Sequence, residues 1–473
     1  QQLSCHSSAG PLFIVLLKVL TYSTDAARNT FGASGEEENA NAVIADFRLG
    51  ISAPEPRFET DSLAHKITKR LLCIQEGADK QKHAGDIIFG LSGEPRGSHL
   101  LETILLLSPD AVHADVVKYG DFVSPESMQA YVEHEVSNFV IQTLLTSIRS
   151  KEQAEAVLKV VEKVISNGLA VDPSKRRRGI LWRATELSAK FRVGQESMLK
   201  SLKLGFATVN SVENTNSDEK KKQRKKASAV DMRDCVLRLV NLRNSGDSER
   251  IGLDAAGVRC VHHLLRFTPR LCEDILKTIV EAYSAEELVR IAKDGLGSRC
   301  VMDGILDGAV KTPFFITAVK ALFVKLKGHW VSLATDRVGH HTVKKMIYAL
   351  PKIDDKAKLA DELSSGGNRL SGNAMGRSVV ELCLLDLFHD NRKDWRQKMS
   401  KSMSKDDGFV AEITAKTGED SELKTKSKRK RKRKRADKSG ADSGEQVVKK
   451  GQSASSFGVD AILNVISHPN EKR

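Results

Sequence analysis

An amide, an aromatic ring and a second amide stand close together in the segment 136–145, Val-Ser-Asn-Phe-Val-Ile-Gln-Thr-Leu-Leu. In a helix of 3.6 residues per turn, Asn138 and Gln142 share one face, with Phe139 beside them. The apolar residues fall on the other face: Val140, Ile141, Leu144 and Leu145. Amides donate and accept hydrogen bonds and a flat ring can stack, so this set is suited to the edge and face of a nucleotide base.

The same pattern returns behind a glycine in five further segments: 97–105, 257–265, 297–302, 339–344 and 376–381. The starts lie roughly 40 residues apart, which is within the period range of stacked helical repeats. A glycine just before a helix allows a tight turn and a close approach between helices. The candidate contact residues in these segments are Ser98, His99, Glu102, Arg259, His262, Ser298, Arg299, His340, His341, Lys344, Arg377, Ser378 and Glu381.

Two further copies of the pattern are weaker. The copy at 62–73 has Ala64, His65 and Thr68 at the polar positions, and the copy at 175–183 has a glycine and an apolar pair but arginines in place of small polar residues. The segments between the copies predict the first and third helices of successive units: 82–91, 125–136, 151–167, 232–242, 271–283, 285–293, 312–327, 330–334 and 356–364. The array is therefore predicted to be all-α.

Some positions have two interpretations. His262 and His263 are either buried histidines or contacts, and Arg259 is the preferred contact of that segment. Lys344 and Arg377 are suited to phosphate contact, which positions RNA without specifying its sequence.

One copy departs from the pattern at the last of its three polar residues, which lies five places after the glycine. After Ser298 and Arg299 this position holds Met302, and an acidic residue, Asp303, comes one residue late. Contact with a base is doubtful there.

Charge is concentrated in two short runs. Of a net charge of +14, eight positive charges come from Lys428, Arg429, Lys430, Arg431, Lys432, Arg433, Lys434 and Arg435, and six from the segment 220–226, so the remainder is about neutral. Such runs are typical of nuclear import and of salt-dependent attraction to RNA. We therefore expect a nuclear-localisation segment at 428–435.

Composition and motifs limit the function classes. The seven cysteines are scattered without metal-ligand spacing, which predicts no metal, no cofactor and a reducing intracellular compartment. The apolar run 11–17 is too short to cross a bilayer and predicts a partial repeat helix. No phosphate-binding glycine loop, GxSxG or HExxH is found, so no enzyme is predicted.

Three regions are expected. Residues 1–56 form a partial repeat and a loop in a chain that is incomplete at its N-terminus, 57–399 form the helical array, and 400–473 form a disordered basic tail. A disordered basic insertion is expected at about 209–227, where apolar periodicity is lost. The role of the apolar patch 459–466 is left open.

The spacing of the polar residues resembles that of Pumilio (PUF) repeats over most of residues 60–399. The sets Ser98-His99-x-x-Glu102 and Asn138-Phe139-x-x-Gln142 match the base-contacting pattern of that family. The resemblance implies a curved α-solenoid of three-helix repeats that binds single-stranded RNA, one base per repeat. It also implies uracil at the Asn138 unit and guanine at the Ser98 unit.

Irregular spacing and a lysine-rich insertion are similar to the nucleolar Pumilio-like subfamily, the nucleolar protein nine and plant Pumilio twenty-three type. This resemblance implies a monomeric protein of the nucleus and nucleolus. It also implies that the chain binds precursor ribosomal RNA, in single-stranded or structured form, within pre-ribosomal particles during small-subunit assembly. The alternative is a nuclear armadillo- or HEAT-like adaptor that binds protein, because stacked helices also form such surfaces.

Overall fold

The computed structural model describes residues 9–22, 57–74, 78–172, 177–213, 230–244, 251–308 and 313–400. All of these residues belong to one compact unit, and residues 401–473 lie outside the described residues. The described residues are helical apart from one short hairpin. The predicted all-α solenoid of stacked helical units is confirmed.

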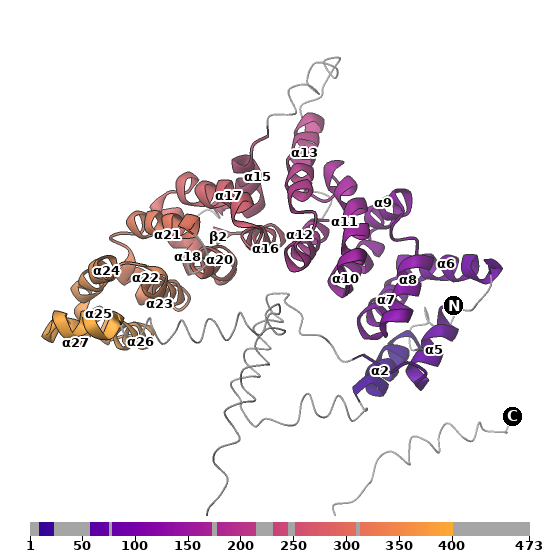
Figure 1. Ribbon diagram of the computed structural model, residues 1–473, viewed down its shortest axis with the longest axis horizontal. Coiled ribbons are helices and arrows are strands. Elements are labelled where there is room, and N and C mark those ends of the chain that lie inside the picture. The colour runs from indigo at the N-terminus through magenta and orange to yellow at the C-terminus, as the bar shows by residue number, and fades with distance from the viewer. Residues whose placement is uncertain are drawn as a thin grey trace, which may run out of the picture. The chain divides into compact units, whose positions relative to one another are not determined.

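The middle helices of the units form one continuous row (Figure 1). In order they are α2 (Ala9–Tyr22), α7 (Pro95–Leu107), α10 (Ser137–Ser147), α12 (Arg178–Phe191), α16 (Ala255–Leu264), the run α19–η3–α20 (Gly295–Gly297, Ser298–Met302, Asp303–Gly308), α23 (Gly339–Ala349) and α26 (Ala374–Cys383). Each of these middle helices packs on the next one along the chain. The middle helices therefore present one continuous side of the stack.

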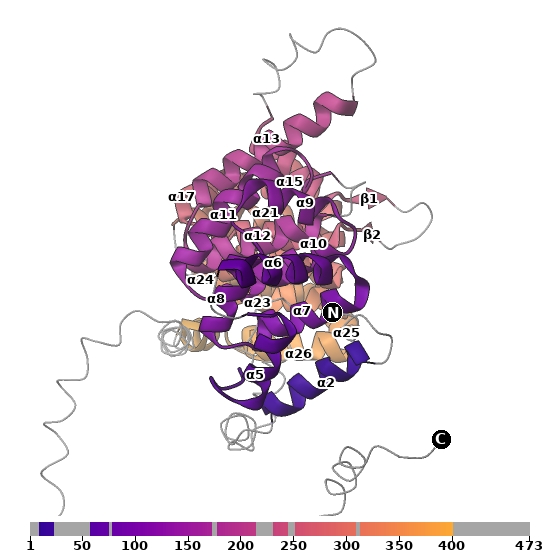
Figure 2. The same cartoon turned by 90° about the vertical axis from the view of Figure 1, so that its right-hand side faces the viewer.

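The first and third helices of the units cover the other side of this row (Figures 1 and 2). The first helices are α6 (Ala78–Gly93), α9 (Pro125–Glu133), α15 (Met232–Val240), α18 (Ala285–Lys293), α22 (Trp330–Ala334) and α25 (Gly367–Ser371). The third helices are α5 (Leu63–Leu71), α8 (Asp110–Tyr119), α11 (Lys151–Ser166), α13 (Gln195–Glu213), α17 (Pro269–Ala282), α21 (Pro313–Lys325), α24 (Ile353–Ser365) and α27 (Leu385–Asp390).

The apolar stripe of each middle helix forms the core, as the periodicity predicts. On α10, the four residues Val140, Ile141, Leu144 and Leu145 are all buried. Every unit contributes such a stripe to a single continuous hydrophobic core. Burial of side chains of this size contributes about 1.5–3 kcal/mol each before entropy is considered.

A glycine near the start of five middle helices allows close packing, as predicted. A Cβ atom on Gly97, Gly297, Gly339 or Gly376 would lie between 2.4 and 3.0 Å from the carbonyl oxygen of the leucine or isoleucine six residues earlier. The middle helix thus begins directly against the last turn of the first helix. A side chain there would push the two helices apart.

The fifth glycine, Gly257, makes the same contact across a longer connection. Its Cβ would lie 2.0 Å from the carbonyl oxygen of Leu239, which is eighteen residues earlier. The additional residues include an antiparallel hairpin of β1 (Arg243–Asn244) and β2 (Ile251–Gly252). The sequence did not predict this hairpin, because its strands have only two residues each.

We expect Gly257→Ala to lower the free energy of unfolding by about 1–3 kcal/mol, because the methyl group would overlap a backbone oxygen that cannot move without displacing α15. The matched control is Gly295→Ala, where no atom lies within 4 Å of the added Cβ. Urea denaturation of both variants measures the difference. Equal losses at the two positions would contradict the packing role.

Two boundaries differ from the predictions. The segment 62–73 is not a middle helix: Ala64, His65 and Thr68 of α5 are buried, and α2 lies beside α7 in its place. Helix α13 continues to Glu213, so the insertion expected from about residue 209 begins later, and residues 214–229 lie outside the described residues. Among the described residues, no helix is long and apolar enough to cross a membrane.

Candidate nucleic-acid interface

The repeated face of a middle helix has three positions, which we number one, two and five. Position one is the residue that follows the glycine, and in α10 it is the residue that follows Ser137. At position one, Ser98, Asn138, Ser298 and His340 are buried. The Ser98 hydroxyl donates to the Pro95 carbonyl at 2.9 Å, and the Asn138 amide donates to the Glu135 carbonyl. The Ser98 and Asn138 side chains are held against their own helix, so positions two and five provide the accessible groups of these two units. In the α26 unit, position one is the exposed Arg377.

Position two carries the exposed groups. His99, Arg299 and His341 are exposed, and the ring of Phe139 is 54% exposed, although an aromatic ring usually lies in a core. Arg259 is half-buried. Four units therefore present an exposed flat side chain, which is what stacking on a base requires.

Position five lies between neighbouring units. Glu102 of α7 accepts a hydrogen bond from Thr143 of α10 at 3.1 Å, and Lys344 of α23 donates to Ser378 of α26 at 2.6 Å. Burial raises the pKa of Glu102. Its other carboxylate oxygen, Oε1, is buried and lies 3.4 Å from Nδ1 of His99, the position-two residue of the same helix.

Within α10, the two amides are bonded to each other. The Gln142 side-chain N–H donates to the Asn138 carbonyl oxygen at 3.0 Å. This bond orients the half-buried Gln142 from position one, so Asn138 acts as a positioning residue for Gln142.

A π-helical turn changes the register of the unit whose middle helix is the run α19–η3–α20. Ser298–Met302 is π-helical, and the backbone N–H of Asp303 bonds to the carbonyl of Ser298, five residues earlier. The additional residue buries Met302 completely and turns Asp303 toward the next unit. Single π-turns of this kind are frequent at functional sites.

Asp303 therefore takes the place that Glu102 has in its unit. The carboxylate of Asp303 lies 3.0 Å from the ammonium of Lys345, the residue after position five on α23. Thr143, which binds Glu102, is likewise the residue after position five on α10. The acidic residue that the sequence places one residue late thus occupies position five, because the π-turn absorbs the extra residue.

Asp303 should make stability depend on pH. Burial raises the pKa of the Asp303 carboxyl to about 6, above the ordinary aspartate value of 3.8. The folded state therefore binds more protons between these values, so this group's contribution to stability is lost as pH rises from about 4 to 6. We expect Asp303→Asn to gain stability relative to the parent over this interval and to stay constant above it. Urea denaturation from pH 4 to 8 measures this, with Asp307→Asn, the more exposed partner of Lys345, as control. An unchanged pH profile would contradict it.

The unit of α12 is also shifted from the predicted register. Ile180 and Leu181 align with the buried pair Val140 and Ile141 of α10, so Gly179 is at position two and not before the helix. Packing agrees, because a Cβ on Gly179 would lie 2.2 Å from Oε1 of Gln142. The glycine that suggested a degenerate copy is thus a position-two residue without a side chain.

Two residues of α12 were missed from the sequence. Arg178, at position one, is buried and pairs with Asp254 at 2.9 Å. Trp182, at position five, lies against two guanidinium groups, with Arg183 Cζ at 3.8 Å and Arg259 Cζ at 4.4 Å from the ring centroid. The tryptophan beside arginines could have indicated this cluster had the register been placed on the apolar pair.

The histidines of α16 are neutral groups. Burial lowers the pKa of His262 to about 4 and holds that of His263 well below its usual range. His263 is buried, whereas the half-buried His262 is at position five, with Nδ1 3.2 Å from the Cys300 carbonyl oxygen of the next unit. His262 is therefore the one of the two that lies at a polar position.

The last unit is the most open. Arg377 and Glu381 are exposed, and Ser378 is half-buried. Arg377 donates to the Ser371 carbonyl at 3.1 Å, which leaves further N–H groups for a phosphate. The basic segments 220–226 and 428–435 lie outside the described residues.

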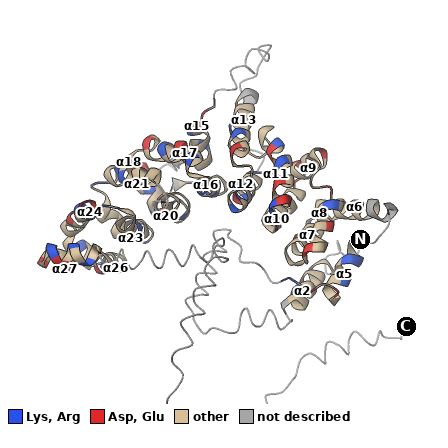
Figure 3. Cartoon of the chain, in the orientation of Figure 1, with Lys and Arg blue, Asp and Glu red and all other residues tan. Residues whose placement is uncertain are grey.

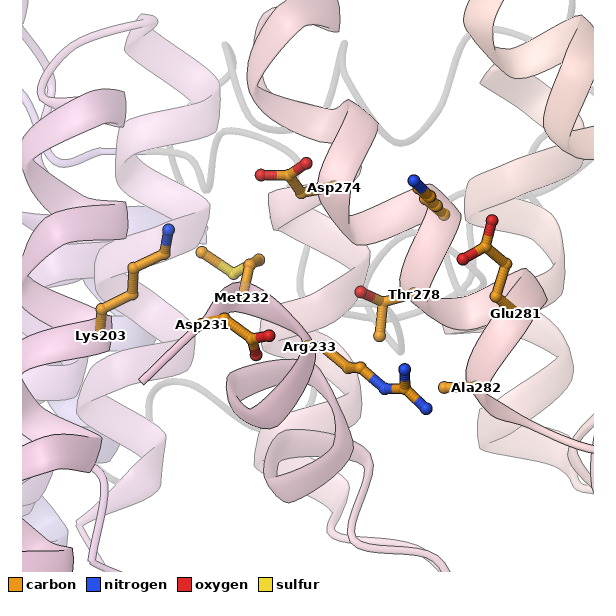
Figure 4. A pocket seen from close by; sticks show the side chains of 9 residues that line it. Lys203, Asp231, Met232, Arg233, Asp274, Thr278, Glu281 and Ala282 are labelled. Atoms are coloured by element: carbon orange, nitrogen blue, oxygen red, sulfur yellow. The ribbon is translucent and has the colours of Figure 1, made fainter. Parts of the chain in front are cut away.

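A shallow hollow of about 280 Å³ lies away from the repeated face, among α13, α15 and α17 (Figure 4). Its charged residues balance: Lys203, Arg233 and Lys277 against Asp231, Asp274 and Glu281. Both signs of charge are spread along the helices (Figure 3). Among the described residues, no group of three or more His, Cys, Asp or Glu could hold a metal ion.

Solved structures of similar fold include two of APUM23. "Structure of APUM23-deletion-of-insert-region-GGAAUUGACGG" has a TM-score of 0.60 at 18% identity and covers 85% of this chain and 75% of that chain. "Structure of APUM23-GGAUUUGACGG" has a TM-score of 0.57 at 16% identity and covers 84% and 76%. A solenoid of three-helix units with polar positions one, two and five on its middle helices defines the class of Pumilio-like repeat proteins.

The family model described as NOP9-like PUF repeat domain matches residues 1–378, and the chain belongs to this family. It is 22% identical over 339 residues to Nucleolar protein 9 of Aspergillus oryzae, covering 71% of this chain and 45% of that protein. It is 23% identical over 385 residues to Nucleolar protein 9 of Arthroderma benhamiae, covering 79% and 47%. The chain thus spans about half the length of these curated relatives.

The family confirms the nucleolar Pumilio-like resemblance drawn from the sequence. It is a nucleolar family of RNA-binding repeat proteins and not of enzymes, in agreement with the prediction from the motifs.

Proposed function

We propose that this chain binds precursor ribosomal RNA through positions two and five of its middle helices and acts as a scaffold in small-subunit ribosome biogenesis. The observation that carries the proposal is the exposure of Phe139 beside the oriented Gln142, together with His99 beside Glu102. Each pair combines a side chain that can stack on a base with a side chain that can form hydrogen bonds to it. RNA is the ligand that needs both in every unit.

The chemistry of position five supports base selectivity. Glu102 is an acceptor, which favours the adjacent N–H donors of guanine, whereas the amide of Gln142 both donates and accepts and suits uracil. Asp303, brought to position five by the π-turn, is a second acceptor. Arg299, His341, Lys344 and Arg377 would add stacking and phosphate contacts.

The test is crosslinking of the full chain to RNA in cells, followed by sequencing of the bound RNA. The proposal predicts enrichment of precursor ribosomal RNA near the small-subunit region, and loss of that enrichment when Phe139 and Gln142 are replaced by alanine. Enrichment of messenger RNA alone would refute the ribosomal role while leaving RNA binding intact.

We also propose that the basic run 428–435 directs the chain to the nucleus and nucleolus. Deleting these eight residues in a protein whose basic residues in 220–226, the other dense basic run, are replaced by alanine should move a fluorescent fusion largely into the cytoplasm. Deleting residues 459–466 is the matched control and should change nothing. Nucleolar fluorescence that survives the first deletion would contradict the assignment.

The alternative, a protein-binding adaptor, makes a different prediction. Partners recovered with the tagged chain should persist after nuclease treatment if they bind protein surfaces, and should be lost if RNA connects them. The repeated stacking residues favour the second result.

A further inference from the structure

The α12 unit differs from its neighbours at all three polar positions. At position one, the Arg178 guanidinium is turned into the protein, where it donates to the Val171 carbonyl at 3.1 Å and to the Arg238 carbonyl at 3.2 Å. At position two, Gly179 has no side chain, and Gln142 from α10 fills the space beside it. Neither position can contact a base.

Position five of this unit is occupied by an aromatic ring already in contact with two cations. Trp182 cannot accept a hydrogen bond, and its only donor, Nε1, is buried. Its ring lies against Arg183 and Arg259. The unit therefore lacks both an exposed flat group of its own and a hydrogen-bonding edge for a base.

The two arginines still have N–H groups that can bind a ligand. A guanidinium that stacks on an indole uses its flat face, and its N–H groups point outward in its own plane. Arg183 donates one of these to Glu186 at 2.6 Å and has others left. Arg259, from position two of α16, brings a second set. N–H groups of this kind bind a phosphate through paired hydrogen bonds.

We propose that the α12 unit does not recognise a base, and that Arg183 and Arg259, held on Trp182, bind the phosphate of a nucleotide whose base is left unrecognised. This rests on the proposed RNA binding and refines it. The bound RNA then has two recognised blocks, one at α7 and α10 and the other beyond Trp182, separated by a position of free sequence.

The first test is selection by the full chain from a pool of randomised single-stranded RNA. The proposal predicts an enriched motif with an internal position that shows no base preference. Replacing that nucleotide by an abasic one should change the affinity by less than about twofold, whereas an abasic nucleotide at a stacked flanking position should cost about tenfold. An uninterrupted motif, in which every abasic change is costly, overturns the proposal.

The second test separates phosphate contact from base contact. Arg259→Ala should weaken binding of the selected RNA about tenfold at low salt and reduce the slope of log affinity against log salt by about 0.7, the value for one single-strand phosphate. The base preferences of this variant should match those of the parent chain. Arg270→Ala, which removes an exposed arginine from α17, is the control and should leave affinity and slope unaltered.

The outcomes are distinguishable from failure of the proposed function. If the parent chain enriches no RNA, RNA binding itself is refuted, and this inference with it. Suppose instead that the parent chain enriches RNA, and that Arg259→Ala changes the base preference at one position without changing the salt slope. Arg259 then stacks on a base, and only the present inference is overturned.

Discussion

Replacing Phe139 and Gln142 together with alanine is expected to weaken binding of the RNA selected by the full chain by about tenfold to a hundredfold. Loss of one stacked base costs about 1–3 kcal/mol, and each 1.4 kcal/mol corresponds to a factor of ten. Phe139 is 54% exposed, so its removal opens no cavity in the core. Asn138 is left in place because it is buried.

The control for this variant is Phe314→Ala. Phe314 is 43% exposed on α21, a third helix away from the row of middle helices, so it matches Phe139 in type and exposure. Fluorescence anisotropy at fixed salt measures both affinities, and circular dichroism checks that both variants remain helical. Equal affinities for the two variants would remove the support for base contact at α10.

Arg178→Ala is expected to have the largest effect on stability, a loss of about 3–5 kcal/mol in the free energy of unfolding. The guanidinium joins three elements: the chain before α12 through Val171, α15 through Arg238, and the start of α16 through Asp254. Asp254 also accepts the N–H of Gly257 at the beginning of α16. Removing the cation leaves a half-buried carboxylate and two carbonyls without this partner.

Two companion variants make the stability test specific. Arg178→Lys keeps the charge but cannot reach three acceptors with a planar fork, so it should recover only part of the loss. Arg233→Ala removes an exposed arginine of α15 and should stay within about 0.5 kcal/mol of the parent. Denaturation with guanidinium chloride measures the free energy of unfolding of the three variants. A loss for Arg178→Ala no larger than that for Arg233→Ala would contradict the role of the buried pair.

The all-helical array could be predicted because each unit repeats the same apolar stripe. Periodicity located the helix of Val140 and Leu144, and the glycines before the middle helices located the close contacts between helices. These features depend on a few neighbouring residues and are therefore visible in the sequence.

What the sequence could not supply was the exact register. Asp303 reaches position five only through a π-turn, and such a turn depends on the packing of Met302. Gly179 is predicted from the sequence only as the glycine of a degenerate copy, whereas it lies on the face beside Gln142. In both cases tertiary contacts decide which side a residue faces.

Burial of the position-one residues was also not predictable from pattern alone. Ser98 and Asn138 are small polar residues on a predicted outer face, yet each bonds to a carbonyl three residues earlier. Short polar side chains often bond to their own backbone in this way. In these two units the position-one side chain is therefore bound to its own helix, and contact with a ligand is left to positions two and five.

The hairpin between α15 and α16 has a practical consequence for engineering. Gly257 meets Leu239 as closely as any of its counterparts, although the connection between them is three times as long. This close contact is thus kept across a connection that is twelve residues longer than in the other units. A fluorescent protein or an affinity tag could be spliced in at this point, giving an internal label without altering either terminus.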